Sequence, residues 1–80
     1  MKVFFYGKLA SAIGPRLDVP IETPCSVASL RRHLVAAYPH VAEALEDKRV
    51  KAIVGDTVVG DDHALGTQDE VEFLAPVSGG

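Results

Sequence analysis

A single cysteine, Cys25, is the only thiol in the 80-residue chain, and this scarcity excludes several classes of small protein. One thiol cannot close an internal disulfide, and without a second cysteine nearby it makes no zinc-ligand spacing. Long apolar runs are missing as well: none approaches the ~20 residues of a membrane helix, and residues 1–6 are too short for the core of a signal peptide. We therefore expect a cytosolic protein without a disulfide, a zinc site or a membrane segment.

An excess of positive charge is also absent, because Lys and Arg number 8 against 11 Asp and Glu, for a net charge of −3. The basic residues are scattered along the sequence rather than gathered in one stripe, so we do not expect a nucleic-acid partner. Hydrophobic residues make up 48% and charged residues 24%, which is the balance of an ordinary globular domain. Eighty residues suffice for one such domain and not for two.

Residues 2–6 are rich in aromatic and β-branched side chains and are followed by a glycine, which predicts a first strand. Side chains alternate between the two faces of a strand, so Val3 and Phe5 should point toward the core. Phe4 and Tyr6 then lie on the opposite face.

Four further segments have strand signals. Residues 16–21 alternate, and Pro20 should place them at an edge or end the strand there, because proline donates no ladder hydrogen bond. Residues 50–54 and 57–59 should pair through a two-residue hairpin turn of the Gly-X kind, and residues 70–74 form the last strand.

Between these strands the spacing of Val27, Leu30, Leu34 and Tyr38 predicts a helix capped by Ser26. Pro39 should end it, and a short helical turn over residues 41–46 should follow. The opposite, solvated side of this helix is expected to carry Arg31, Arg32 and His33.

The remaining segments are predicted loops. Residues 7–16 should form a long loop, and residues 61–69 another, in which Ala64 and Leu65 plug the core. The element order predicts an α+β fold, the ubiquitin-like β-grasp arrangement, with a mixed sheet of about five strands packed on one main helix. Residues 1–75 should form this domain and residues 76–80 a flexible C-terminal tail.

No set of side chains suggests a catalytic centre. The three histidines are far apart in the predicted elements, and Cys25 is expected to pack at the helix start. The acidic loop residues lack a calcium-binding pattern, and two basic residues near the first turn are weak evidence for a phosphate site. These groups are His33, His40, His63, Cys25, Asp56, Asp61, Asp62, Lys8 and Arg16.

The C-terminus carries the clearest functional signal, because the last strand is followed by a short spacer and two glycines: Pro76, Val77, Ser78, Gly79 and Gly80. Glycine lacks a Cβ, so such a tail can thread a narrow channel in another protein. It would deliver the carboxyl of Gly80 to that protein's active site. A carboxylate is a poor electrophile, so its activation must come from outside the chain.

Three segments make the whole chain resemble the small, sulfur-carrying subunit of molybdopterin synthase, of the ubiquitin-like β-grasp family. They are residues 3–9 with Gly14 after them, the helix start at residues 26–30, and the ending at residues 69–80. The ending is the most specific of the three.

This resemblance implies that a ubiquitin-activating-like adenylyltransferase adenylates Gly80 with ATP and Mg²⁺, and that a persulfide sulfur donor then converts it to a thiocarboxylate. The large subunit of molybdopterin synthase would receive the tail, and sulfur would pass to cyclic pyranopterin monophosphate on the route to the molybdenum cofactor. Catalytic side chains are expected on that large subunit, so this chain would be the non-catalytic one. It would bind no cofactor permanently.

Strand parity suggests where such partners dock. Phe4, Tyr6, Ile53 and Leu74 should lie on the face of the sheet that has no second layer, and exposed apolar groups often mark a binding surface.

Other readings of the same tail stay open. The chain could carry sulfur for another pathway, such as thiamine, tRNA thiolation or cysteine synthesis. It could instead be a protein modifier that forms isopeptide bonds through Gly80, or a simple binding module with an incidental glycine tail.

Overall fold

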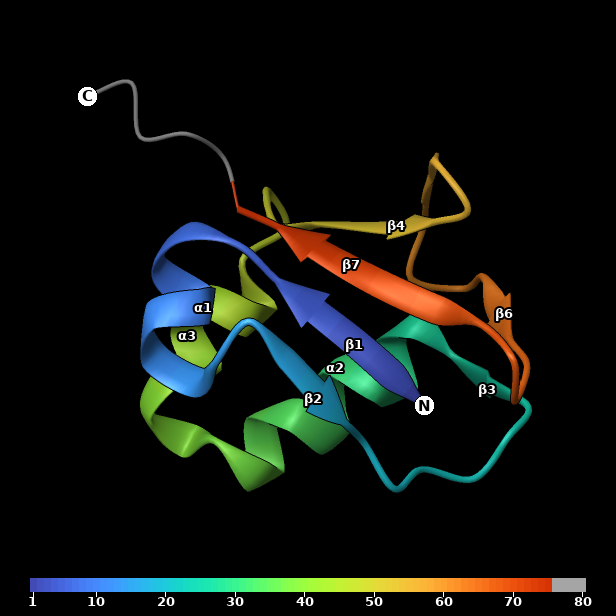
Figure 1. Ribbon diagram of the computed structural model, residues 1–80, viewed down its shortest axis with the longest axis horizontal. Coiled ribbons are helices and arrows are strands. Elements are labelled where there is room, and N and C mark those ends of the chain that lie inside the picture. The colour runs from blue at the N-terminus through green and yellow to red at the C-terminus, as the bar shows by residue number, and fades with distance from the viewer. Residues whose placement is uncertain (76–80) are drawn as a thin grey trace.

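A mixed sheet with helices on one face organises the chain, as the computed structural model shows for residues 1–75 (Figure 1). The elements are β1 (Lys2–Phe5), α1 (Gly7–Ile13), β2 (Arg16–Asp18), β3 (Cys25–Ser26), α2 (Val27–Ala37), η1 (Pro39–Val41), α3 (Ala42–Glu46), β4 (Lys51–Val54), β5 (Thr57–Val59), β6 (Ala64–Leu65) and β7 (Glu70–Leu74).

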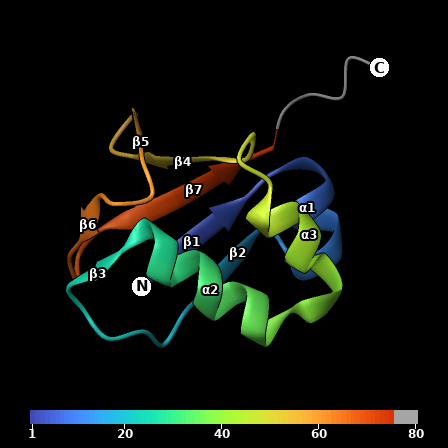
Figure 2. The ribbon, with the colours of Figure 1, turned by 180° about the vertical axis from the view of Figure 1, so that it is seen from behind.

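The sheet is five-stranded, in the order β2-β1-β7-β4-β5, and β1 and β7 are its parallel central pair. The other neighbours are antiparallel, and β3 and β6 form a separate two-stranded ladder. Helices α2 and α3 lie in front of the sheet in Figure 2, whereas the face seen in Figure 1 has no helix across it. This arrangement confirms the predicted β-grasp fold.

The core lies between the sheet and α2, as the alternation of β1 and β7 predicts. Val3, Phe5, Val71 and Phe73 are at most 1% exposed, and the rings of Phe5 and Phe73 stack with centroids 6.0 Å apart. The other buried core residues are Leu9, Val19, Val27, Leu30, Leu34, Val41, Leu45, Val50, Ala52 and Leu65. Leu65 therefore plugs the core as expected, whereas its neighbour Ala64 is exposed. The two residues form β6, so the predicted loop over residues 61–69 is wrong at this point, where the segment pairs with β3.

The main helix begins as the sequence predicts. The Ser26 hydroxyl accepts a hydrogen bond from the backbone N–H of Ser29 at 3.1 Å, which satisfies one of the donors that a helix start leaves unpaired. Pro39 follows the C-cap residue Tyr38 and opens η1. The second strand also behaves as expected, since β2 is an edge strand and ends at Asp18, before Pro20.

The predicted loop over residues 7–16 is wrong, because most of it is helix α1. Leu9 and Ile13, four residues apart, pack against the core, and Gly14 ends the helix with φ 99° while its N–H bonds to the carbonyl of Ala10. The helix has no side-chain cap and only seven residues, so its sequence signal is weak.

The hairpin between β4 and β5 is in the predicted place, but its turn differs from the Gly-X kind. Gly55 has φ 54° and Asp56 has φ 68°, and positive φ at both central residues is the type I′ geometry. Glycine and aspartate are both among the residues that tolerate this region.

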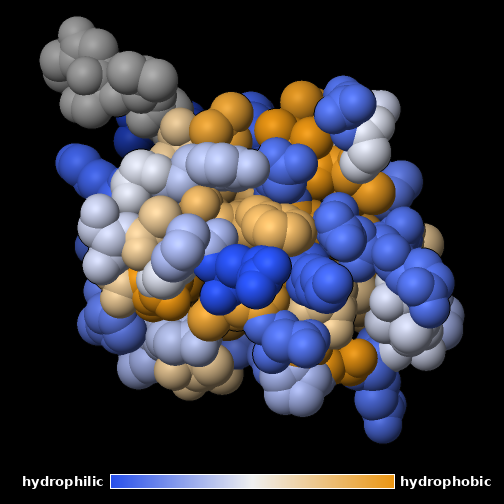
Figure 3. All heavy atoms as spheres, in the orientation of Figure 1, coloured by the Kyte–Doolittle hydropathy of each residue, from blue (hydrophilic) through white to orange (hydrophobic). Residues whose placement is uncertain are grey.

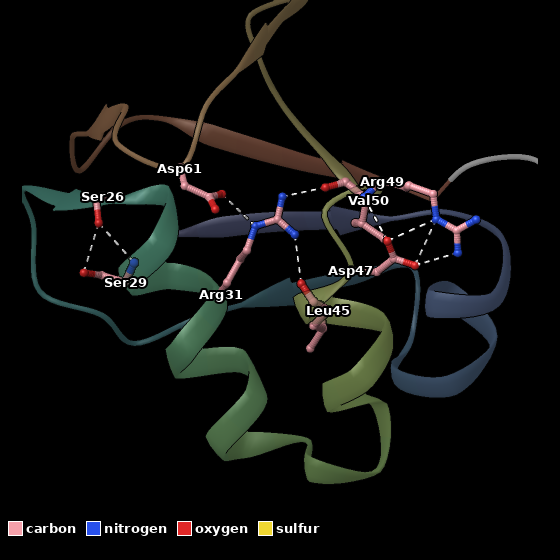
Figure 4. A network of polar contacts seen from close by, with 8 residues as sticks. All are labelled: Ser26, Ser29, Arg31, Leu45, Asp47, Arg49, Val50 and Asp61. Carbon is pink, nitrogen blue, oxygen red and sulfur yellow. Dashed lines mark hydrogen bonds and ion pairs between the residues drawn. The ribbon is translucent and has the colours of Figure 1, made fainter.

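Arg31 is not solvated, contrary to the sequence prediction. Its side chain is only 13% exposed, and it donates hydrogen bonds to the carbonyls of Leu45 and Val50 and to the carboxylate of Asp61 (Figure 4). Its guanidinium carbon also lies 5.1 Å from the ring centre of Phe73. One arginine therefore joins α2 to α3, to the start of β4 and to the loop before β6.

Replacement of this arginine should destabilise the fold. Arg31→Ala leaves two backbone carbonyls without their donor, and we expect it to lower the free energy of unfolding by about 2–4 kcal/mol. Arg32→Ala is the matched control, because the Arg32 side chain is exposed and bonds only to the hydroxyl of Ser29 among residues 1–75. Urea unfolding measures both, and equal stability of the two variants would contradict this role for Arg31.

Asp47 provides a pH-dependent contribution at the turn before β4. Hydrogen bonds from the side chain and backbone N–H of Arg49 lower the pKa of Asp47 to about 2 (Figure 4). A carboxyl whose pKa is lower in the folded state stabilises the fold above its unfolded pKa, and this contribution disappears as the pH falls through the folded value.

We expect Asp47→Asn to reduce stability at pH 7, with a difference from the parent protein that shrinks between about pH 4 and pH 2. Urea midpoints measured across this range would show it. A difference that stayed constant down to pH 2 would mean that the charge of Asp47 is not responsible.

Candidate functional site

The face of the sheet away from the helices carries a row of side chains from four strands. In the strand register Glu72 lies between Phe4 and Ile53, and Ile53 pairs in turn with Val58. Leu74 lies two residues beyond Glu72 on the same face, at the end of β7. Adjacent paired residues point to the same side of a sheet, so these groups share one surface.

Three large hydrophobic side chains within residues 1–75 are exposed, and all three belong to this face: Tyr6 at 45%, Val58 at 61% and Leu74 at 45%. Phe4 and Ile53 are half-buried beside them. Figure 3 looks onto this face, where hydrophobic atoms gather over its centre and upper edge with hydrophilic ones around and between them. We call Phe4, Tyr6, Ile53, Val58 and Leu74 the open-face patch.

The four residues that the sequence predicted for this patch lie on one face in the structure. Val58 also belongs to it and was not predicted. A signal for Val58 was present. A two-residue turn at residues 55–56 pairs Ile53 with Val58, and paired residues share a face.

A polar pair interrupts the open-face patch. The hydroxyl of Tyr6 donates to the Glu72 carboxylate at 3.1 Å. This hydrogen bond raises the pKa of Tyr6, with smaller contributions from burial and from the negative charge of Glu72. The sequence analysis had assigned no binding role to Glu72.

Charged side chains of both signs surround the open-face patch. Lys51 lies opposite Leu74 where β7 ends, and Arg16 pairs with Phe4, in the same row as Glu72. At the opposite end of the strands Asp18 and Glu70 flank Lys2 in the register, and the N-terminal amine lies 3.5 Å from the carboxylate of Asp18. Lys51 and Arg16, which are far apart in the sequence, are thus brought to the same face of the sheet as the patch.

The predicted tail begins where β7 ends. Pro76, Val77, Ser78, Gly79 and Gly80 lie outside the residues that the structure describes, so the boundary at residue 75 and the flexibility of the tail stay predictions. Leu74 is the last residue of β7 and belongs to the open-face patch. The chain therefore leaves the sheet at the edge of this patch.

The other candidate groups do not form a site. No cluster of three or more His, Cys, Asp or Glu residues within residues 1–75 could hold a metal ion. Cys25 is half-buried in β3, and the loop acids Asp56, Asp61 and Asp62 are exposed. No helix in this part of the chain is long and apolar enough to cross a membrane.

Known proteins match both the sequence and the fold. The model of the ThiS family matches residues 3–80. The molybdopterin synthase sulfur carrier subunit of Escherichia coli (strain K12) is 38% identical over 81 residues, which cover 100% of this chain and 99% of that protein.

Two solved structures agree in fold. SAMP1 from Haloferax volcanii has a TM-score of 0.84 at 21% identity, over 99% of this chain and 97% of its own. A protein of Pyrococcus furiosus described as molybdopterin converting factor, subunit 1, has a TM-score of 0.80 at 20% identity, over 95% of each chain. Because the family model and the E. coli relative both match almost from end to end, the chain belongs to the ThiS family of ubiquitin-like sulfur carriers.

Proposed function

We propose that this chain is the sulfur-carrying small subunit of a molybdopterin synthase and that the carboxyl of Gly80 is its working group. The end-to-end identity of 38% with the E. coli sulfur carrier subunit carries the proposal. A second observation supports it: β7 ends at the edge of the open-face patch, a few residues before Gly79 and Gly80.

The proposed chemistry begins with activation of Gly80 by a ubiquitin-activating-like adenylyltransferase. A carboxylate oxygen attacks the α-phosphorus of ATP, bound with Mg²⁺, and pyrophosphate leaves. The outer sulfur of a protein persulfide then attacks the acyl carbon and AMP leaves. A thiol cleaves the S–S bond of the resulting acyl disulfide, so the thiocarboxylate is released and the persulfide donor forms a disulfide with that thiol.

The thiocarboxylate would next give its sulfur to cyclic pyranopterin monophosphate inside the large subunit, and two such rounds supply both sulfurs of molybdopterin. The five residues after Ala75 can span up to ~17 Å when extended, which suffices to reach a site inside a partner. General acids and bases belong to the large subunit in this proposal. In residues 1–75 the histidines and acidic groups do not converge on such a site.

The open-face patch is the proposed docking surface for the large subunit and for the activating enzyme. Each of Tyr6, Val58 and Leu74 exposes a large apolar group that another protein can bury. Leu74 matters most, because it directly precedes the tail and would set where that tail enters the partner.

The tail chemistry is tested by mass. We expect incubation with ATP, Mg²⁺, the activating enzyme and a persulfide donor to replace one carboxyl oxygen of Gly80 by sulfur, which intact-mass spectrometry detects.

Deletion of Gly80 should abolish the change without moving the unfolding midpoint, because residues 1–75 contain the whole described core. An unchanged mass, while the E. coli carrier reacts in the same mixture, would refute the sulfur-carrier proposal. Attachment of Gly80 to lysines of other proteins would favour the modifier alternative.

The docking surface is tested by charge insertion. Leu74→Asp and Val58→Asp should weaken binding to the large subunit more than tenfold, because burial of one such side chain contributes roughly 1.5–3 kcal/mol. Thr57→Asp is the matched control, since Thr57 is exposed beside Val58 in β5 but points to the other face. Calorimetric titration measures all three, and unchanged affinity in both patch variants would exclude this face as the docking surface.

A further inference from the structure

The open-face patch has a carboxylate at its centre. Glu72 lies opposite Phe4 on one side and Ile53 on the other, and Leu74 follows it on the same face. Its side chain is half-buried by these neighbours. A carboxylate at this position loses its remaining water whenever another protein covers the face.

The partners of Glu72 within residues 1–75 leave most of its hydrogen-bonding capacity unused. Tyr6 donates one hydrogen bond to it, and no cation in this part of the chain forms an ion pair with it. A carboxylate has about four acceptor positions, so a single hydroxyl fills only a fraction of them. Water must serve the rest while the face is open.

Docking removes that water. If the partner offered only apolar side chains opposite Glu72, a charge would be buried with one neutral hydrogen bond, and the cost would offset much of the gain from the surrounding apolar contacts. A cationic side chain opposite Glu72 removes this penalty, and a guanidinium suits it best because its several N–H groups can reach the free acceptor positions.

We infer that Glu72, oriented by Tyr6, is a specificity-determining residue that selects a large subunit presenting an arginine or lysine to the middle of the open-face patch. This inference rests on the proposed docking of that patch. The apolar side chains of the open-face patch supply contact area. The carboxylate of Glu72 weakens binding to any partner that has no positive charge opposite it.

Binding of the purified chain to the large subunit from the same genome tests the inference. We expect Glu72→Gln to weaken binding at least tenfold and Glu72→Lys at least a hundredfold. Glu70 provides the matched control, because it lies on the same strand and face but at the other end of β7, where its register partner is Lys2. Glu70→Gln should change affinity less than threefold.

Two further measurements separate specificity from a structural role. Tyr6→Phe should weaken binding severalfold in the parent protein but not in Glu72→Gln, because the hydroxyl acts through the carboxylate. Replacement of the facing arginine or lysine of the large subunit by glutamate should restore binding to Glu72→Lys. Unfolding midpoints of all variants should stay close to that of the parent.

The outcomes distinguish this inference from the docking proposal. If Leu74→Asp weakens binding and Glu72→Gln does not, the patch docks but Glu72 has no cationic counterpart, and the inference is wrong. Tighter binding of Glu72→Gln would overturn it in the same way. If neither variant weakens binding, the open-face patch is not the docking surface.

Discussion

The alternation of side chains along the parallel β1–β7 pair is the constraint on which the rest of the structure depends. Burial of Val3 and Phe5 on one face, with their partners on β7, commits the intervening residues to the other face. Within residues 1–75 helices α2 and α3 cover one side of the sheet (Figure 2), and the other side carries no helix across it. The open-face patch is thus a consequence of how the core is built, and the last strand delivers the C-terminal segment to its edge.

Arg31 fixes the other side of this arrangement. Its guanidinium donates hydrogen bonds to α3, to Val50 just before β4 and to the loop before β6 (Figure 4). It also lies over the ring of Phe73. The start of β4 pairs with the end of β7, so the same contacts help hold the strand end from which the tail departs. In the function proposed above this rigidity has a use, because the chain would have to place its terminal carboxyl relative to a docking surface.

In the proposed function the partner enzymes supply the catalytic groups, which explains why the histidines and acidic residues within residues 1–75 form no cluster. A protein that must be handled in turn by an activating enzyme and by a synthase gains nothing from reactive groups of its own. It needs a surface that both partners can recognise and a tail that both can bind. Tyr6 and Glu72 add a polar element to that surface, and such an element distinguishes partners better than apolar area does.

The sequence by itself determined the five strands of the main sheet, the capped main helix and the inward residues of both, because these depend on short-range periodicity and on local cap chemistry. It did not determine the short β3–β6 ladder, whose strands pair across about 40 residues of sequence. Only the tertiary structure decided the role of Arg31, since its acceptors lie 14 to 30 residues away along the chain. Helix α1 escaped prediction because seven residues without a side-chain N-cap carry little local signal, and the packing of Leu9 holds them in place. The meeting of Tyr6 with Glu72, 66 residues apart, likewise required the parallel pairing of β1 with β7, which no local pattern specifies.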